Sequence, residues 1–253
     1  MRLSLFEIKT IIKYKNEIFG DSAKIYLFGS RIDDTKKGGD IDLYIEAVNI
    51  DDVFTKKIEF LSSIQQIIGE QKIDLVFAKD ENRAIEIEAK TKGVVLDLEK
   101  IRLQKYFNEC DKHLQRIEEA YEDMKDIIPL SANKYKNLTK DEVQDIDQYI
   151  FRFEKLQDTL GDKIFRLIIM QYEQNSETLP FIDILNRLEK LGFINSSKEW
   201  INLRKIRNEI SHQYDDEPEE MSQAINKIIS QKDIIKEIYL KLKNRYTSLI
   251  TKA

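Results

Sequence analysis

The chain has 253 residues, a formal net charge of −5 and 34% charged residues. This length suits two ordinary domains, and the balanced charge excludes a polybasic protein that binds nucleic acid over its whole surface. Cys110 is the single cysteine, which excludes an internal disulfide and a cysteine-based zinc cluster.

Residues 1–19 combine recurring Lys and Glu with apolar residues at helical spacing, and the segment ends at Gly20. This pattern predicts an amphipathic helix with glycine as its C-cap. Because the segment contains no long apolar run, it reads neither as a signal peptide nor as a membrane span. We therefore expect a cytoplasmic protein without membrane contact.

Short apolar or alternating runs predict the strands of a small sheet. Residues 24–28 form an apolar run, and residues 40–47 and 72–78 alternate polar and apolar side chains in period two. Helical spacing fills residues 52–69 between the last two runs, and residues 93–98 suggest a short edge strand. We expect a small sheet with helices packed alongside it.

Beyond about residue 100 the strand signals stop, and apolar residues recur at helical spacing in five segments. The breaks between them fall at Pro129, Pro180, Gly192 and Pro218. Five helices with short connections predict a bundle. The expected fold class is therefore α+β, with a mixed domain at residues 1–100 and an all-α bundle at residues 101–253.

Two residues of the predicted bundle are assigned to ordinary roles. His113 stands alone on a charged helix, which predicts a solvated side chain. Trp200 and the other aromatic residues of the bundle occur at helical spacing, so they predict a core and not a base-stacking surface.

Acidic residues gather on one predicted face of the sheet. Asp40 and Asp42 lie two residues apart on one strand and therefore point to the same side. Asp74 holds the matching place on a later strand and joins them if the strands are neighbours. Carboxylates this close repel one another unless a cation lies between them, and Mg²⁺ bridging carboxylates and phosphates is a common solution. The alternative is a pair of solvated aspartates on an edge strand.

A Gly29-Ser30 step directly follows the first predicted strand. Glycine lets the backbone approach a phosphate closely. Ser30 offers a hydroxyl and an N–H group at a predicted helix N-terminus, where the helix dipole favours anions. Together with the carboxylate strand ten residues later, this step predicts a metal–nucleotide site.

The order of strand, Gly-Ser, spacer, Asp-x-Asp strand, helix and "IDLVF" resembles the minimal nucleotidyltransferase family, relatives of the polymerase-β-type transferases. The resemblance implies a polymerase-β-like fold for residues 1–100, two Mg²⁺ ions, and ATP or another nucleoside triphosphate as substrate. It also implies in-line attack on the α-phosphate with pyrophosphate as the leaving group.

The residues that match the family's motif are Gly29 and Ser30 for the triphosphate, Asp40 and Asp42 for the metals, and Asp74 as a third carboxylate that helps to activate the incoming hydroxyl. Arg31 stands where members often show Gly-Ser-Arg, which implies a phosphate contact. Members often continue Ala-Arg-Gly after that arginine, whereas this chain has Ile32, Asp33 and Asp34.

A second group of chemically active residues consists of Arg207, His212 and Tyr214. Arginine offers a planar fork for a phosphate, and histidine transfers protons near neutral pH, so the pair suits metal-free RNA cleavage. His212 would promote attack by the 2′-hydroxyl, and Arg207 would stabilise the charged phosphorane. From spacing alone, a solvated helix face with a structural histidine is the more ordinary interpretation.

The surrounding helix resembles the signature helix of the HEPN superfamily (higher eukaryotes and prokaryotes nucleotide-binding), in the version R-x-x-x-x-H-x-Y that accompanies minimal nucleotidyltransferases. Residues 149–168 resemble an earlier helix of the same group. In those pairs the helical protein is an RNase toxin, and the transferase is its antitoxin, which transfers AMP from ATP to the motif tyrosine, here Tyr214. The resemblance further implies RNA as a substrate of the bundle and a homodimer through it.

The leading expectation is a Mg²⁺-dependent nucleotidyltransferase that AMPylates Tyr214, fused to a ribonuclease-like domain as a single-chain toxin–antitoxin or defence module. Toxin and antitoxin are normally separate chains, and it stays open whether this bundle still cuts RNA. Two alternatives also stay open. Kanamycin-type nucleotidyltransferases join a similar catalytic domain to a helical bundle and modify a small-molecule hydroxyl. A non-enzymatic dimeric binding protein would use the bundle as an interaction surface.

Overall fold

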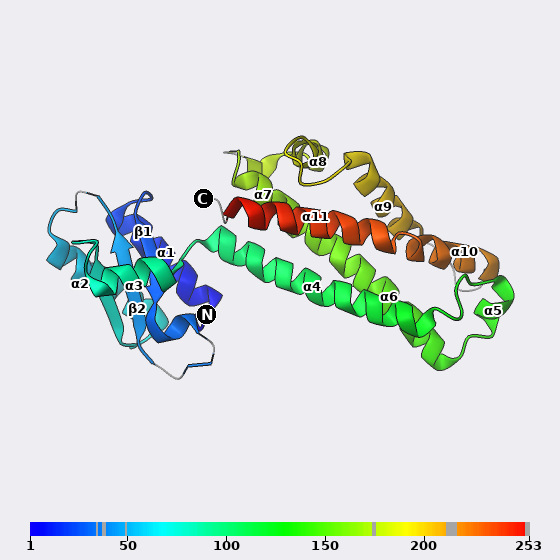
Figure 1. The fold of residues 1–253 in the computed structure, drawn as a ribbon, viewed down its shortest axis with the longest axis horizontal. Helices are drawn as coiled ribbons and strands as arrows, with labels where there is room; N and C mark the ends of the chain where they lie inside the picture. The colour runs from blue at the N-terminus through cyan, green and yellow to red at the C-terminus, as the bar shows by residue number, and fades with distance from the viewer. Residues whose placement is uncertain (34, 37–38, 49, 174–175, 211–216, 251–253) are drawn as a thin grey trace. The chain divides into compact units, whose positions relative to one another are not determined.

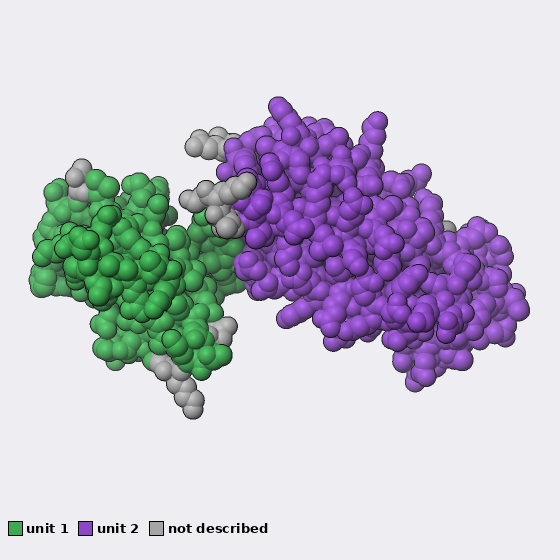
Figure 2. Space-filling view, viewed as in Figure 1, with its two compact units in different colours: residues 1–101 green, residues 102–253 purple. Residues whose placement is uncertain are grey.

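The computed structural model describes the chain except for residues 34, 37–38, 49, 174–175, 211–216 and 251–253 (Figure 1). The chain divides into two compact units, Met1–Ile101 and Arg102–Ala253 (Figure 2). The boundary expected after residue 100 lies next to this division. Each unit has a hydrophobic core of its own, so each is described separately.

Unit 1 is built on a four-stranded sheet with the strand order β3-β2-β1-β4. Strand β1 runs antiparallel to β2 and β4, and β3 runs parallel to β2. The elements in chain order are α1 (Leu5–Phe19), β1 (Lys24–Phe28), the 3₁₀ turn η1 (Gly29–Ile32), β2 (Ile41–Glu46), α2 (Val53–Ile68), β3 (Ile73–Phe77), α3 (Ala84–Lys92) and β4 (Val94–Val95). Strand β4 confirms the short edge strand expected between residues 93 and 98.

Alternation along β2 separates the two faces of the sheet, as its sequence predicts. Ile41, Leu43 and Ile45 are fully buried in one core, where α1 and α2 also pack. On the opposite face Tyr44 is buried and packs with Ala89 of α3. Helix α1 starts with a capping box at Ser4 and ends at Gly20, which has a φ of +86° and confirms the predicted glycine C-cap. The sheet thus presents Asp42 on the face that α3 partly covers.

All regular elements among the described residues of unit 2 are helices, joined by turns and loops. Its elements are α4 (Leu98–Met124, which begins in unit 1), α5 (Ala132–Lys136), α6 (Lys140–Asp158), the π-helical segment η2 (Thr159–Ile164), α7 (Phe165–Met170), the 3₁₀ turn η3 (Ser176–Thr178), α8 (Phe181–Lys190), α9 (Ser197–Ile210), α10 (Pro218–Ile229) and α11 (Lys232–Ile250). The five predicted segments are present. Two are interrupted, one by η2 and one between α10 and α11.

The long helices α4 and α11 run alongside each other (Figure 1). Tyr239 of α11 donates a hydrogen bond to the carbonyl of Phe107 in α4 at 3.0 Å, and the two rings pack together. Trp200 of α9 is 1% exposed, and its ring centroid lies 4.5 Å from that of Phe165. The expected core role of Trp200 is therefore confirmed. No helix within the described ranges is long and apolar enough to cross a membrane.

The prediction that His113 is solvated was wrong. His113 is 8% exposed, with its Nδ1 atom 3.5 Å from Nη1 of Arg152 in α6. It falls on the buried stripe of α4 that includes Cys110 and Ile117, so helix packing covers it in spite of its charged sequence neighbours. Burial, followed by the charge of Arg152, lowers the pKa of His113 below its ordinary value.

Helix α6 begins with a capping box whose acidic residue, Glu142, also forms an ion pair. The N–H group of Thr139 donates to Glu142 at 2.7 Å, and the Thr139 hydroxyl accepts from the Glu142 N–H group at 3.2 Å. The Lys134 ammonium lies 2.8 Å from the Glu142 carboxylate. The bond to Lys134 and these capping bonds lower the pKa of Glu142 to about 2. The capping bonds with Thr139 and the ion pair with Lys134 thus both hold Glu142 at the start of this helix.

Candidate functional site

The three aspartates predicted as metal ligands lie at the start of strands β2 and β3. Asp42 and Asp74 are register partners on these parallel strands, and Asp40 lies directly before β2. The strands are therefore neighbours, as the sequence argument required. Register partners on parallel strands project to the same face, opposite here to Ile41 and Leu43. Asp42 is half-buried, and Asp74 is exposed.

These carboxylates influence one another electrostatically. Burial raises the pKa of Asp42, and the charges of Asp74 and Asp40 raise it further. Glu88 of α3 adds to the same effect, whereas Lys72 opposes it. A carboxylate whose pKa is raised by like charges is one that a bound cation would stabilise in its ionised form. The starts of β2 and β3 with Asp40, Asp42 and Asp74, called the acidic edge below, therefore carry like charges that a cation would offset.

Lys72 is part of this edge, and the sequence reasoning missed it. Its ammonium group forms an ion pair with Asp40, and its Nζ atom lies 3.6 Å from Oδ2 of Asp74. Lys72 precedes β3 by one residue and Asp74 by two. The alternation that assigned Asp74 to this face would have assigned Lys72 to the same face.

The structure does not assemble the three aspartates into one ligand set. Within the described residues, no three His, Cys, Asp or Glu side chains converge closely enough to hold a metal ion. Lys72 instead bridges Asp40 and Asp74. Mg²⁺ is usually bound by one or two carboxylates together with water and substrate phosphates, and it does not need an all-protein cage. As register partners on one face, Asp42 and Asp74 are two oxygen-bearing side chains of the type that such a magnesium–phosphate site would use.

Gly29 is required where β1 approaches the carboxylate strand. Its φ is +69°, a conformation that residues with side chains rarely adopt. A Cβ atom at this position would lie 2.2 Å from Oδ2 and 2.9 Å from Cγ of Asp42. The absent side chain of Gly29 thus provides the space that the Asp42 carboxylate fills. The Gly-Ser step and the Asp-x-Asp strand are one packed feature of unit 1.

Ser30 and Arg31 lie in the single turn η1, so the helix N-terminus expected at Ser30 is only one turn long. The guanidinium group of Arg31 donates to the carbonyl of Arg2 at 3.3 Å, to the carbonyl of Gly39, and to Oε1 of Gln71 at 3.0 Å. Arg31 therefore connects three separate segments of unit 1. These bonds would have to be exchanged before Arg31 could bind the predicted phosphate.

A buried acid braces α3 over the same face of the sheet. Glu86 is 1% exposed and accepts hydrogen bonds from the Tyr44 hydroxyl at 3.1 Å and from the N–H groups of Lys79 and Asp80 at 3.0 and 3.1 Å. Burial alone would raise the pKa of Glu86, but these bonds lower it overall. Burial and the bond to Glu86 raise the pKa of Tyr44 to about 12. This network fixes the helix that carries Glu88.

The second predicted group is only partly described. Arg207 lies on α9, where its Nη2 atom donates to Oδ1 of Asp158 at 2.7 Å and its Nε atom lies 3.6 Å from Oε1 of Glu154. His212 and Tyr214 fall outside the described residues. Asp158 directly precedes the π-helical segment η2, a type of helical irregularity that is common at functional sites.

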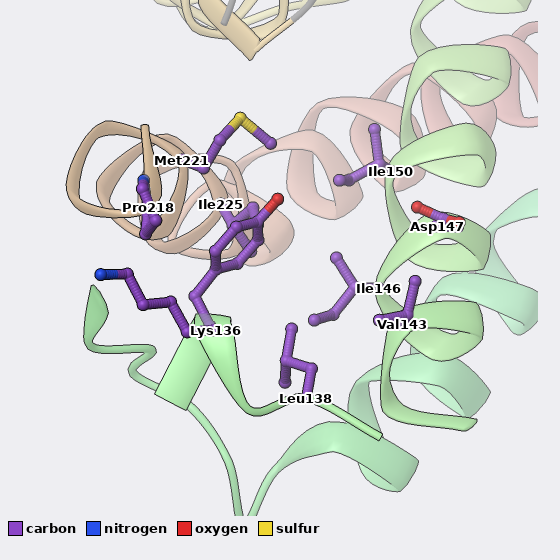
Figure 3. A pocket seen from close by; sticks show the side chains of 10 residues that line it. Lys136, Leu138, Val143, Ile146, Asp147, Ile150, Pro218, Met221 and Ile225 are labelled. Carbon is purple, nitrogen blue, oxygen red and sulfur yellow. The ribbon is translucent and has the colours of Figure 1, made fainter. Parts of the chain in front are cut away.

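A pocket of about 500 Å³ lies between α5, α6 and α10 of unit 2 (Figure 3). Ile146, Ile150 and Ile225 line it, together with Lys136 and Asp147. Its described lining contains one acidic residue, whereas metal-dependent phosphoryl chemistry uses several. The β2–β3 edge of unit 1 is the better candidate for a nucleotide site.

Comparison with known proteins supplies no relative from which residue roles could be transferred. No family model, no curated protein and no solved structure matches the chain. The chemistry of the site therefore follows from its own geometry. That geometry combines two carboxylates in register, the ammonium group of Lys72 and the glycine turn at Gly29.

Proposed function

We propose that this protein is a Mg²⁺-dependent nucleotidyltransferase that transfers AMP from ATP to a hydroxyl group. One observation carries the proposal: Asp42 and Asp74 are register partners on parallel strands, and the turn at Gly29 is shaped around the Asp42 carboxylate. Paired carboxylates beside a glycine turn suit a metal ion that also binds substrate phosphates.

In the proposed reaction a hydroxyl oxygen attacks the α-phosphorus of ATP and forms a new P–O bond. The bond between the α-phosphorus and the oxygen that bridges to the β-phosphate breaks, and pyrophosphate leaves with the electron pair. Asp74 accepts the proton of the attacking hydroxyl, since it is the exposed member of the register pair. When bound, Mg²⁺ would be held by Asp42 and its neighbours and would neutralise phosphate charge.

Tyr214 is the proposed acceptor, and the bundle is the proposed ribonuclease-like partner domain. An AMP group on Tyr214 would add bulk and negative charge near the R-x-x-x-x-H motif and block access of RNA. Arg207 is already held between two carboxylates, Asp158 and Glu154, so a phosphate must compete with them. Because both domains share one chain, modification replaces dissociation as the switch. It acts in cis or across a homodimer.

The direct test uses ATP labelled at the α-phosphate, with Mg²⁺ and purified full-length protein. We expect label on the wild type, mapped to Tyr214 by peptide mass spectrometry, and no label on Asp42→Asn or Tyr214→Phe. Transfer to an aminoglycoside that persists in Tyr214→Phe would support a small-molecule acceptor instead. A folded wild type that neither binds nor uses ATP would contradict the proposed transferase.

Growth of cells that express the variants tests the role of the bundle. Asp42→Ala should be toxic, because an unmodified ribonuclease-like domain would cut RNA, and His212→Ala should abolish this toxicity in the double variant. Equal growth of all variants would argue that the bundle does not cut RNA. That result would leave the transferase chemistry to the labelling experiment.

A further inference from the structure

We infer that Lys72 is an exchangeable cation of this site: it pairs with the acidic edge before a metal binds, and it binds the triphosphate afterwards. The inference rests on the proposed function and deepens it by naming the residue that competes with the metal and then contacts the nucleotide. Three features of the structure carry it, namely charge, exposure and the engagement of the neighbouring basic side chains.

The first feature is charge. Lys72 pairs with Asp40 and lies 3.6 Å from Asp74, whose register partner is Asp42. When all four groups are ionised, three negative charges and one positive charge leave the edge with a net charge of −2. A single ammonium group therefore compensates the carboxylates only in part. A divalent cation compensates them better and is expected to displace the ammonium from them.

The second feature is exposure. The side chain of Lys72 is 65% exposed, and those of Asp40 and Asp74 are 43% and 57% exposed. Ion pairs in such surroundings are weak and exchange readily with solvent or other ions. The flexible four-carbon stem of lysine lets the ammonium move without any change of the backbone. After displacement it would stay tethered one residue before β3 and two residues before Asp74.

The third feature is the engagement of neighbouring basic side chains. Arg31 is bound to three protein oxygens. The next two residues, Ile32 and Asp33, carry no basic side chain. Lys57 of α2 donates to the carbonyl of Leu75 at 2.8 Å. Among the described residues, Lys72 is the basic side chain recorded against both Asp40 and Asp74.

The two roles of Lys72 predict effects of opposite sign. Lys72→Met removes the competitor of the metal, so the affinity for Mn²⁺ without nucleotide should rise about two- to fivefold, the range expected for loss of an exposed ion pair. The same change removes a charged hydrogen bond to the triphosphate, so the affinity for a nucleotide with Mg²⁺ should fall about tenfold or more. A residue that merely braces the fold would weaken both.

The experiment measures both affinities on full-length protein. Free Mn²⁺ is followed by electron paramagnetic resonance, and binding of an α,β-methylene analogue of ATP with Mg²⁺ is followed by calorimetry. Lys79→Met is the matched control, because it removes the same charge from an exposed residue beyond the opposite end of β3. We expect tighter Mn²⁺ and weaker analogue binding in Lys72→Met, intermediate analogue binding in Lys72→Arg, and wild-type values in Lys79→Met.

The inference is overturned if Lys72→Met matches Lys79→Met, or if both affinities fall in a variant whose circular dichroism is unchanged. Asp42→Asn separates this failure from failure of the proposed function. If the wild type binds Mn²⁺ and the analogue and Asp42→Asn does not, the transferase site stands whatever Lys72 does. If the wild type binds neither, the proposed function fails and the role of Lys72 fails with it.

Discussion

Replacing Gly29 by alanine tests how closely the glycine turn is coupled to the carboxylate strand. At a φ of +69° an alanine costs about 1–2 kcal/mol, as left-handed backbone does for residues with a side chain. The new Cβ atom would also lie 2.2 Å from Oδ2 of Asp42, so the carboxylate must move. Overpacking of this kind costs about 1–3 kcal/mol. The sum predicts that unit 1 loses about 2–5 kcal/mol in its free energy of unfolding.

Urea unfolding followed by far-ultraviolet circular dichroism measures this loss in the full-length protein. The single tryptophan, Trp200, lies in unit 2, so its fluorescence reports that unit separately. In a protein that already carries Asp42→Ala, the clash with the carboxylate should largely vanish. Gly29→Ala should then lower the free energy of unfolding by only about 1–2 kcal/mol. Gly20→Ala is the control. Gly20 has a φ of +86° and nothing within 4 Å of an added Cβ, so its cost should not depend on Asp42.

The reasoning is refuted if Gly29→Ala costs the same with and without the Asp42 carboxylate. It is also refuted if the single variant is as stable as the wild type. A further expected consequence is weaker binding of the ATP analogue by Gly29→Ala, since a displaced Asp42 no longer lies beside Asp74. Binding at wild-type strength in a destabilised variant would mean that Asp42 does not take part in the site.

Three further predictions concern protonation and a buried hydrogen bond. Burial lowers the pKa of His113 below 6.5, so the folded protein loses stability as the pH falls below 6.5 and the buried imidazole must take up a proton. In His113→Phe the free energy of unfolding should depend less on pH below 6.5, and an unchanged pH profile would contradict this prediction. The Lys134 ammonium and the helix cap lower the pKa of Glu142 from 4.5 to about 2, so Glu142→Gln should remove a loss of stability between those pH values, as acid titration of the circular dichroism signal would show. Tyr44→Phe removes a donor to the buried carboxylate of Glu86 and should cost unit 1 about 1.5–3 kcal/mol in urea unfolding, whereas a gain of stability would argue against that bond.

The sequence predicts the arrangement of the sheet well because alternation is a local signal. Period two along β2 correctly assigns Ile41, Leu43 and Ile45 to the core, and the same rule assigns Asp74 to the outer face of β3. It also implies the position of Lys72. The ion pair between Lys72 and Asp40, however, depends on the pairing of β2 with β3. That pairing joins segments 32 residues apart, so a local pattern does not predict it.

The remaining features depend on contacts between distant segments. The guanidinium group of Arg31 donates hydrogen bonds to Arg2 and Gln71, which lie 29 and 40 residues away. No local sequence pattern therefore predicts that this group already has protein partners. His113 follows the apolar stripe of α4, but its charged sequence neighbours suggest exposure until α6 is packed against it. The interruption at η2 likewise accompanies close packing, since a Cβ at Gly161 would lie 3.1 Å from the Trp200 ring.

The most direct measurement locates a manganese ion by anomalous X-ray scattering in crystals grown with Mn²⁺ and the α,β-methylene analogue of ATP. The account predicts a peak about 2 Å from carboxylate oxygens of both Asp42 and Asp74, with the triphosphate beside Gly29 and the Lys72 ammonium on a phosphate. A nucleotide bound elsewhere, or density at this edge that still shows Lys72 paired with Asp40 and no metal, would contradict it.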